Sequence, residues 1–147
     1  VASLSPDEID ALATDTRIVR HRPKIASTIA NAAFVLEVAE DDGSFGHYLA
    51  EWPAEDVIGL WADLKARGSR LGGATGPRFL RHVGKDTFIL TPDVCASLIE
   101  QGIVSKAPTS KAELKATQAA FCAWAEQSGR PFAEISMVLA CTIESGR

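Results

Sequence analysis

The stretch "LGGATGPRFLRHVGKDTFILTPDV" (Leu71–Val94) contains the signals that best indicate how this chain folds. Three of the five residues from 72 to 76 are glycine, and Pro77 follows them directly. Glycine permits positive φ and a close approach of the backbone, and proline is frequent in the first turn of a helix. The pattern therefore predicts a tight turn between two helices, the second running from Pro77 to about Val83. An ordinary corner between helices would carry the same glycines, so the turn alone does not indicate a binding site.

Helix signals recur on both sides of this turn. Ser5 with Glu8, and Ser110 with Glu113, have the spacing of a capping box. Helices are predicted to begin near residues 6, 23, 45, 53, 77, 92, 111 and 131. The run Asp86–Leu90 resembles a strand but is too short and too isolated to found a sheet. The fold class is therefore predicted to be all-α, a compact single domain of about eight helices over residues 1–147.

Two of these helices have a clear apolar stripe. In the helix from Pro23 to about Gly43, the residues expected on the inner face are Ile25, Ile29, Ala32, Leu36 and Ala39. In the helix ending at Gly68, they are Val57, Ile58, Trp61 and Leu64.

Composition narrows the class of protein. The chain has 147 residues, of which 46% are hydrophobic and 23% charged, and it contains no apolar run long enough to cross a membrane. Its three cysteines are odd in number and far apart, which favours a reducing cytosol over a disulfide framework. No Cys and His pair has zinc-ligand spacing, so neither a metal nor another cofactor is expected.

Positive charge gathers around the glycine turn although the net charge is −4. Between Lys65 and Lys85 there are six Lys or Arg residues and no acid. Such a cluster around open backbone amides is typical of phosphate binding. A second basic run, "RIVRHRPK" (17–24), precedes the long helix. It fits either a second phosphate contact or a solvated helix start, and the sequence favours the latter.

Asp93 follows Thr91 and Pro92 in the first turn of its helix. Any carboxylate there gains from the helix dipole, which is a structural explanation for this residue. A functional alternative is a carboxylate beside a DNA backbone, where it would stabilise positive charge on a sugar or orient a water. Spacing alone does not decide between the two.

These residues together resemble the helix–hairpin–helix DNA glycosylases, and more narrowly the bacterial 3-methyladenine DNA glycosylase I group. "RIVRHRPKIASTIANA" and "GSFGHYLAEW" resemble that group's IVRNRxKIxAxxxNA and GSFxxYLW patterns. "LGGATG" resembles its hairpin, with Gly72 where proline is usual, and "DTFILTPDV" resembles the segment with the catalytic aspartate. The stretch "GIVSKAPTSKAELKATQAAFCAWAEQSGRPFAEIS" is similar to the C-terminal pattern of one subgroup.

The resemblance implies a DNA repair enzyme that hydrolyses the N-glycosidic bond of alkylated purines such as 3-methyladenine. It places the catalytic carboxylate at Asp93. The expected DNA contacts are Gly72, Gly73, Thr75, Gly76, Arg78, Arg81 and Lys85, with the backbone amides of Gly73, Thr75 and Gly76 holding the phosphates. The expected partner is double-stranded DNA with a damaged base, bound by a monomer in the bacterial cytosol at the nucleoid, without a membrane.

Departures from the family pattern sharpen these expectations. The Schiff-base lysine of bifunctional members is replaced by Pro77, which implies a monofunctional hydrolase. Val94 and Leu98 stand where a zinc-binding His and Cys are found, so that zinc is not expected. The family's base-pocket segment is expected upstream of Val1. Two alternatives therefore stay open: a non-catalytic helix–hairpin–helix DNA-binding module and a helical protein–protein adaptor.

Overall fold

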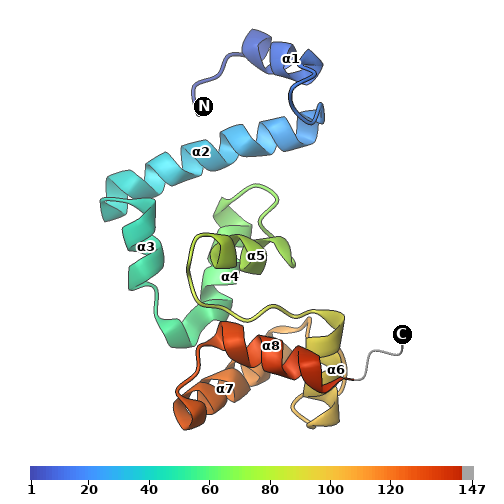
Figure 1. The fold of residues 1–147 in the computed structure, drawn as a ribbon. Coiled ribbons are helices and arrows are strands. Elements are labelled where there is room, and N and C mark those ends of the chain that lie inside the picture. The colour runs from blue at the N-terminus through green and yellow to red at the C-terminus, as the bar shows by residue number, and fades with distance from the viewer. Residues whose placement is uncertain (144–147) are drawn as a thin grey trace.

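The computed structural model describes residues 1–143, which form an all-helical protein (Figure 1). The elements are α1 (Pro6–Thr14), α2 (Arg22–Asp42), α3 (Phe45–Glu51), a 3-10 helix η1 (Ala54–Asp56), α4 (Val57–Arg67), α5 (Thr75–His82), α6 (Pro92–Glu100), α7 (Lys111–Ser128) and α8 (Phe132–Thr142). None of the described residues lies in a strand. The predicted all-α class and its eight α-helices are confirmed.

Most helix starts follow from local chemistry. The side chains of Ser5 and Ser110 accept from the amides of Glu8 and Glu113. The two glutamate carboxylates in turn accept from the serine amides, so both predicted capping boxes form. Thr91 caps α6 by accepting from the Val94 amide, and Pro92 occupies its first turn. These caps satisfy amides that a helix start would otherwise leave open.

Two predicted boundaries are corrected. The helix after the glycine turn begins at Thr75 instead of Pro77, because Thr75 and Gly76 already have helical geometry and Pro77 follows as the third helical residue. The helix predicted from residue 53 splits into η1 and α4, because Asp56 acts as the N-cap of α4 by accepting from the Gly59 amide at 3.1 Å.

The helices are arranged along the length of the molecule (Figure 1). α1 and α2 lie at one end, α4 and α5 in the middle, and α6, α7 and α8 at the other end. α1 contacts α2 and contains no buried residue. The N-terminal end of α2 therefore projects beyond the main body of the protein.

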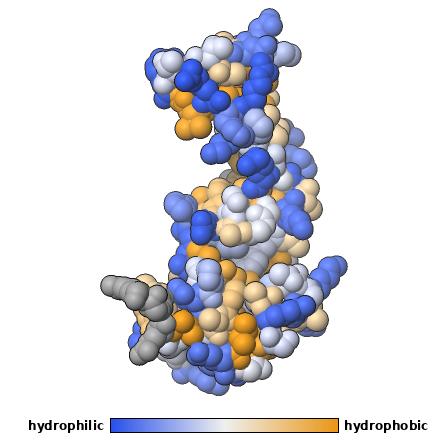
Figure 2. Space-filling view, turned by 90° about the vertical axis from the view of Figure 1, so that its right-hand side faces the viewer, coloured by the Kyte–Doolittle hydropathy of each residue, from blue (hydrophilic) through white to orange (hydrophobic). Residues whose placement is uncertain are grey.

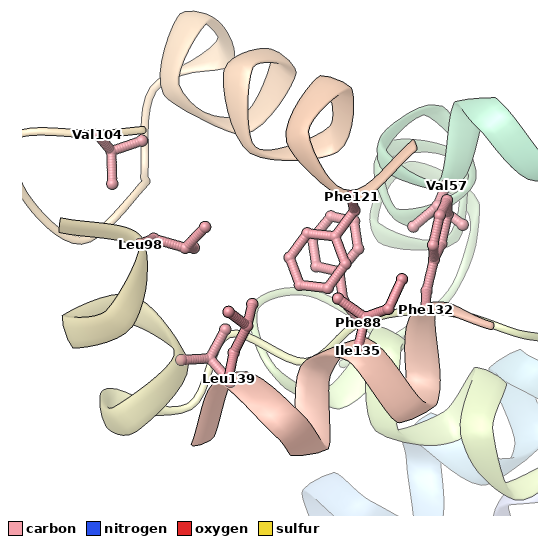
Figure 3. Close-up of a cluster of buried hydrophobic side chains, with 9 residues drawn as sticks. Val57, Phe88, Leu98, Val104, Phe121, Phe132, Ile135 and Leu139 are labelled. Atoms are coloured by element: carbon pink, nitrogen blue, oxygen red, sulfur yellow. The ribbon is translucent and has the colours of Figure 1, made fainter. Parts of the chain in front are cut away.

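Two hydrophobic clusters hold the body together. The larger one joins α4, α6, α7 and α8 around Phe88 and Phe121, whose rings stack at a centroid distance of 4.2 Å (Figure 3). The smaller one joins α2, α3, α4 and α5. Trp61 on α4 packs against both clusters and so links the two ends of the body.

The predicted inner face of α2 is wrong in its second half. Ile25 is buried as expected, but Leu36 is 56% exposed, while Phe34 and Val38 are buried instead. α3 packs against this half of α2, and the Phe45 ring meets the Phe34 ring edge-on at 5.5 Å. The packing of α3 decides which face of α2 is buried, and the periodicity of the α2 sequence does not show where α3 packs.

Candidate nucleic-acid interface

The α4–α5 turn (residues 68–74) has the tight geometry that its glycines predicted. Gly73 has φ +58°, a left-handed conformation that favours glycine, and a Cβ there would meet no atom within 4 Å. At Gly76 a Cβ would lie 2.6 Å from the Leu71 carbonyl oxygen, so the chain closes on itself at that point. The turn is therefore compact on its inner side and open to the solvent at Gly73.

Several backbone amides at the end of this turn and in the first residues of α5 have no acceptor. The Thr75 amide donates to the Gly72 carbonyl oxygen at 3.3 Å. The amides of Gly73, Ala74 and Gly76 donate to no atom of the described residues. Gly73 and Ala74 are exposed, whereas Gly76 is buried. Open amides ahead of a helix N-terminus suit an anion such as a phosphate oxygen.

The predicted hairpin residues thus behave differently from one another. The amides of Gly73 and Gly76 have no acceptor among the described residues, but only Gly73 is exposed, and the amide of Thr75 is used within the turn. Sequence reasoning missed Ala74, although its place between Gly73 and Thr75 was the signal that could have included it. Gly72 is half-buried, and its backbone supplies the acceptor for Thr75.

The cations around the turn fall into two groups. Arg78 is exposed, and its side chain makes no hydrogen bond or ion pair within residues 1–143. Lys65 and Arg70 are exposed as well, and Arg70 has a positive φ of 62°. These three side chains are free to meet an external phosphate.

Arg81 and Lys85 instead contact the protein backbone. Arg81 donates from Nε to the Thr87 carbonyl at 2.9 Å and from Nη2 to the Ala133 carbonyl at 3.2 Å. Lys85 donates from Nζ to the Trp52 carbonyl at 2.7 Å. Both side chains therefore fix neighbouring segments in place, and the structure does not bring them to the α4–α5 turn as free charges.

Arg67 is also engaged. Its guanidinium lies 4.8 Å above the Phe34 ring and pairs with Glu37 at 3.2 Å and Asp63 at 3.6 Å. Asp63 accepts from the Tyr48 hydroxyl at 2.5 Å. Burial first, and then the adjacent Asp63, raise the pKa of Tyr48 well above its ordinary value. This cluster joins α2, α3 and α4 below the turn.

Asn31 of α2 clamps the start of the turn. Its side-chain amide donates to the Ser69 carbonyl at 3.0 Å, and its Oδ1 accepts from the Ser69 amide at 2.7 Å. One side chain thus pairs with both polar groups of a single backbone residue. In the sequence, Asn31 stands at the Asn of the pattern IVRNRxKIxAxxxNA, but nothing there indicated its partner.

The segment between α5 and α6 places Asp93. Asp86 accepts from the amides of Phe132 and Ala133, at 2.7 and 2.9 Å, and so caps α8. Further along, the Ile89 amide donates to the Ser136 hydroxyl at 3.2 Å. These long-range bonds tie the segment to α8 and fix where α6 begins.

Asp93 is half-buried in the first turn of α6. Its carboxylate makes no hydrogen bond or ion pair with any described residue, and Thr91 already performs the capping of this helix. The carboxylate is therefore not needed as a cap. The α4–α5 turn and the beginning of α6 lie toward the same side of the molecule, on the right in Figure 1. Figure 2 views this side, where a pale central area is flanked by hydrophilic patches.

Other possible sites are less suited to a phosphate or a metal. A pocket of about 530 Å³ lies between η1, α7 and the start of α8; of its charged residues, Lys85 and Asp86 are bonded to the backbone and Arg130 pairs with Glu134, which leaves Glu55. No group of three or more His, Cys, Asp or Glu is placed to hold a metal in residues 1–143. Val94 and Leu98, at the family's zinc positions, are apolar and buried in the core, so they do not fit that metal. Within the same residues, no helix is both long and apolar enough to cross a bilayer.

The comparison with family models gives a match to methyladenine glycosylase over residues 1–70. The comparisons with curated proteins and with solved structures gave no match. The matched segment runs from α1 through α4 and ends within the α4–α5 turn, ahead of Gly73 and Asp93. It includes both motifs of the predicted resemblance, "RIVRHRPKIASTIANA" and "GSFGHYLAEW". Residues 1–70 of this chain are therefore similar to the methyladenine glycosylase family.

Proposed function

We propose that this protein is a monofunctional DNA glycosylase that hydrolyses the N-glycosidic bond of alkylated purines such as 3-methyladenine. The observation that carries the proposal is the open α4–α5 turn, in which Gly73 and Ala74 have exposed amides and the free cation Arg78 follows them. The residues that match the methyladenine glycosylase family model end within this turn. The chain would act as one helical domain on damaged double-stranded DNA in the bacterial cytosol.

Binding would be led by the DNA backbone. The Gly73 and Ala74 amides would donate hydrogen bonds to a phosphate at the N-terminus of α5, and Arg78 would add charge beside it. A contact to the sugar–phosphate chain is independent of sequence, which suits a protein that searches DNA for damage. The damaged nucleotide would then leave the base stack, at a cost of a few kcal/mol that is lowest for damaged bases.

Asp93 would serve the chemical step. Water attacks the sugar carbon, the bond from that carbon to the base nitrogen breaks, and the bonding electrons leave with the base. A cationic alkylated purine departs as a neutral molecule, so it needs no protonation. The Asp93 carboxylate would stabilise positive charge on the sugar and accept the proton of the attacking water. Pro77 supplies no amine, so no Schiff base forms and the DNA strand stays uncut.

The chain contains a matched control for Asp93. Ser5, Pro6 and Asp7 begin α1 in the same way that Thr91, Pro92 and Asp93 begin α6. Both acids occupy the second helical position, so Asp93→Asn and Asp7→Asn remove the same interaction with a helix dipole. Only the first should lower the single-turnover rate of base release from methylated duplex DNA, by about a hundredfold or more for a general base.

The result separates the three candidate functions. Equal rates of base release in Asp93→Asn and the native protein, with both folded, contradict the role of Asp93. Salt-sensitive DNA binding without any base release at high protein excess indicates a non-catalytic DNA-binding module. Absence of DNA binding at low salt, in a protein with native helical content, indicates an adaptor.

A further inference from the structure

We propose that the basic segment 17–24, which leads into the first turn of α2, is a second DNA-binding element, in which Arg20 and Lys24 contact phosphates several nucleotides away from the α4–α5 turn. This inference rests on the proposed function for the identity of the partner. It concerns residues that the sequence alone favoured as a solvated helix start, and the structure gives three reasons to assign them a contact.

The cations of this segment divide into two paired and two free charges. Arg17 pairs with Asp15 at 2.7 Å, and Arg22 pairs with Asp10 at 2.5 Å. Arg20 and Lys24 are exposed, and their side chains make no ion pair within the described part of the chain. Asp10 and Asp15 thus neutralise two arginines of the segment, and the charges of Arg20 and Lys24 stay without an ion pair.

The Asn31–Ser69 clamp determines the direction in which Lys24 points. Asn31 projects from α2 toward the α4–α5 turn, because its side-chain nitrogen and oxygen both form hydrogen bonds with the backbone of Ser69. Lys24 lies seven residues earlier, within the same helix. Seven residues are close to two full turns of an α-helix, so Lys24 lies on nearly the same face as Asn31, about 10 Å further along the axis. Lys24 therefore stands on the side of α2 from which the turn is reached.

The arrangement of the helices agrees with this direction. In Figure 1, the connection between α1 and α2 stands above the level of the α4–α5 turn, at the projecting end of the molecule. α1, whose Asp10 pairs with Arg22 of this segment, buries no residue. The surface of the segment is consequently available to a long ligand that extends beyond the turn.

The spacing suits one DNA duplex. Along one strand, phosphates advance by about 3.4 Å per nucleotide, so an axial offset of about 10 Å corresponds to roughly three nucleotides. A strand that is held at the turn and runs along the axis of α2 would therefore meet Lys24 about three nucleotides beyond the level of Asn31. Two such contacts should each add about 0.9 to the magnitude of the slope of log K against log salt concentration.

The test compares two double variants with the same change in net charge. In Arg20→Gln/Lys24→Gln, the affinity for an undamaged fluorescent duplex should fall roughly tenfold at 0.1 M salt, and the salt slope should decrease in magnitude by about 1.8. In the control Lys111→Gln/Lys115→Gln, both exposed lysines lie on α7 at the other end of the molecule, so affinity and slope should stay at the native values. Thermal unfolding of each variant verifies that the fold is intact.

The outcomes distinguish this inference from the proposed function. Native affinity and slope in Arg20→Gln/Lys24→Gln overturn the second DNA-binding element, even where the native protein releases base. An equal loss in the α7 control also overturns it, because the effect would then be one of net charge. Loss in the first variant alone, in a protein that releases no base, supports the element while the proposed catalytic function fails. Absence of all DNA binding by the native protein at low salt overturns both.

Discussion

The first helix and the seventh helix begin with the same capping box but lie in very different surroundings. In α1, Ser5 and Glu8 exchange hydrogen bonds at 3.3 and 2.8 Å, and in α7, Ser110 and Glu113 do so at 3.2 and 3.0 Å. α1 buries no side chain, whereas α7 contributes Thr117 and Phe121 to the protein interior. The local motif forms each helix, and burial decides how much the rest of the protein depends on it.

The largest expected effect concerns the burial itself. Phe121→Ala removes a fully buried ring that stacks on Phe88, and should lower the free energy of unfolding by about 3–5 kcal/mol. Leu12→Ala, at a half-buried position of α1, should lower the free energy of unfolding by about 1 kcal/mol or less, since little buried apolar surface is lost there. Urea unfolding followed by circular dichroism gives both values. Equal losses would show that α1 is as firmly integrated as α7.

A smaller effect is expected from the two caps. Ser110→Ala should lower the free energy of global unfolding by about 1 kcal/mol, because α7 cannot fray without exposing core residues. Ser5→Ala should leave global unfolding within about 0.5 kcal/mol of the native value, because α1 can open on its own.

Hydrogen exchange distinguishes the two cases. Ser5→Ala should speed the exchange of α1 amides while those of α7 stay protected. A global loss of stability in Ser5→Ala equal to that in Ser110→Ala would contradict the comparison.

The smallest effect is expected from the two glutamates, and it depends on pH. Hydrogen bonds from the amides of Ser110 and Thr109 lower the pKa of Glu113 from 4.5 to about 2. A lowered folded-state pKa means that the stabilisation is complete above pH 4.5 and is lost as the pH falls from 4.5 to about 2. Glu113→Gln should therefore melt below the native protein at neutral pH, with a difference in Tm that narrows over this range.

Glu8→Gln provides the matched control for that pH series. The bond with the Ser5 amide likewise lowers the pKa of Glu8. Because α1 opens locally, this variant should show nearly the native global Tm at every pH. A pH-dependent difference in Tm as large as that of Glu113→Gln would contradict the comparison.

The sequence predicted the helices well because their signals are local. Ser5, Thr91 and Ser110 cap the helices that their spacing assigned to them, since a cap and its amide lie within four residues. The start of α5 and the inner face of α2 were predicted wrongly. The start of α5 depends on the closure of the turn against Leu71, a local contact that the position of Pro77 does not reveal. The inner face of α2 depends on packing by another helix, α3.

The candidate site was only partly predictable for the same reason. Gly73 was identified because a left-handed turn needs glycine, which is a local requirement. Asn31 was missed, since its partner Ser69 lies 38 residues away in sequence. The roles of Arg81 and Lys85 as DNA contacts stay predictions, and their bonds to backbone carbonyls give them a structural task that no local pattern indicates.

By itself, the sequence determined that this chain forms capped helices, that a tight glycine turn joins two of them, and that cations gather around that turn. These properties arise from interactions between residues close together in the chain. Only the tertiary structure decided that Arg78, Arg20 and Lys24 are among the cations left free and that the Asp93 carboxylate has no partner within residues 1–143. A charge is neutralised by whatever group the fold brings within a few ångströms of it, and for Arg22 and Arg67 that group includes an acid 12 and 30 residues away in sequence.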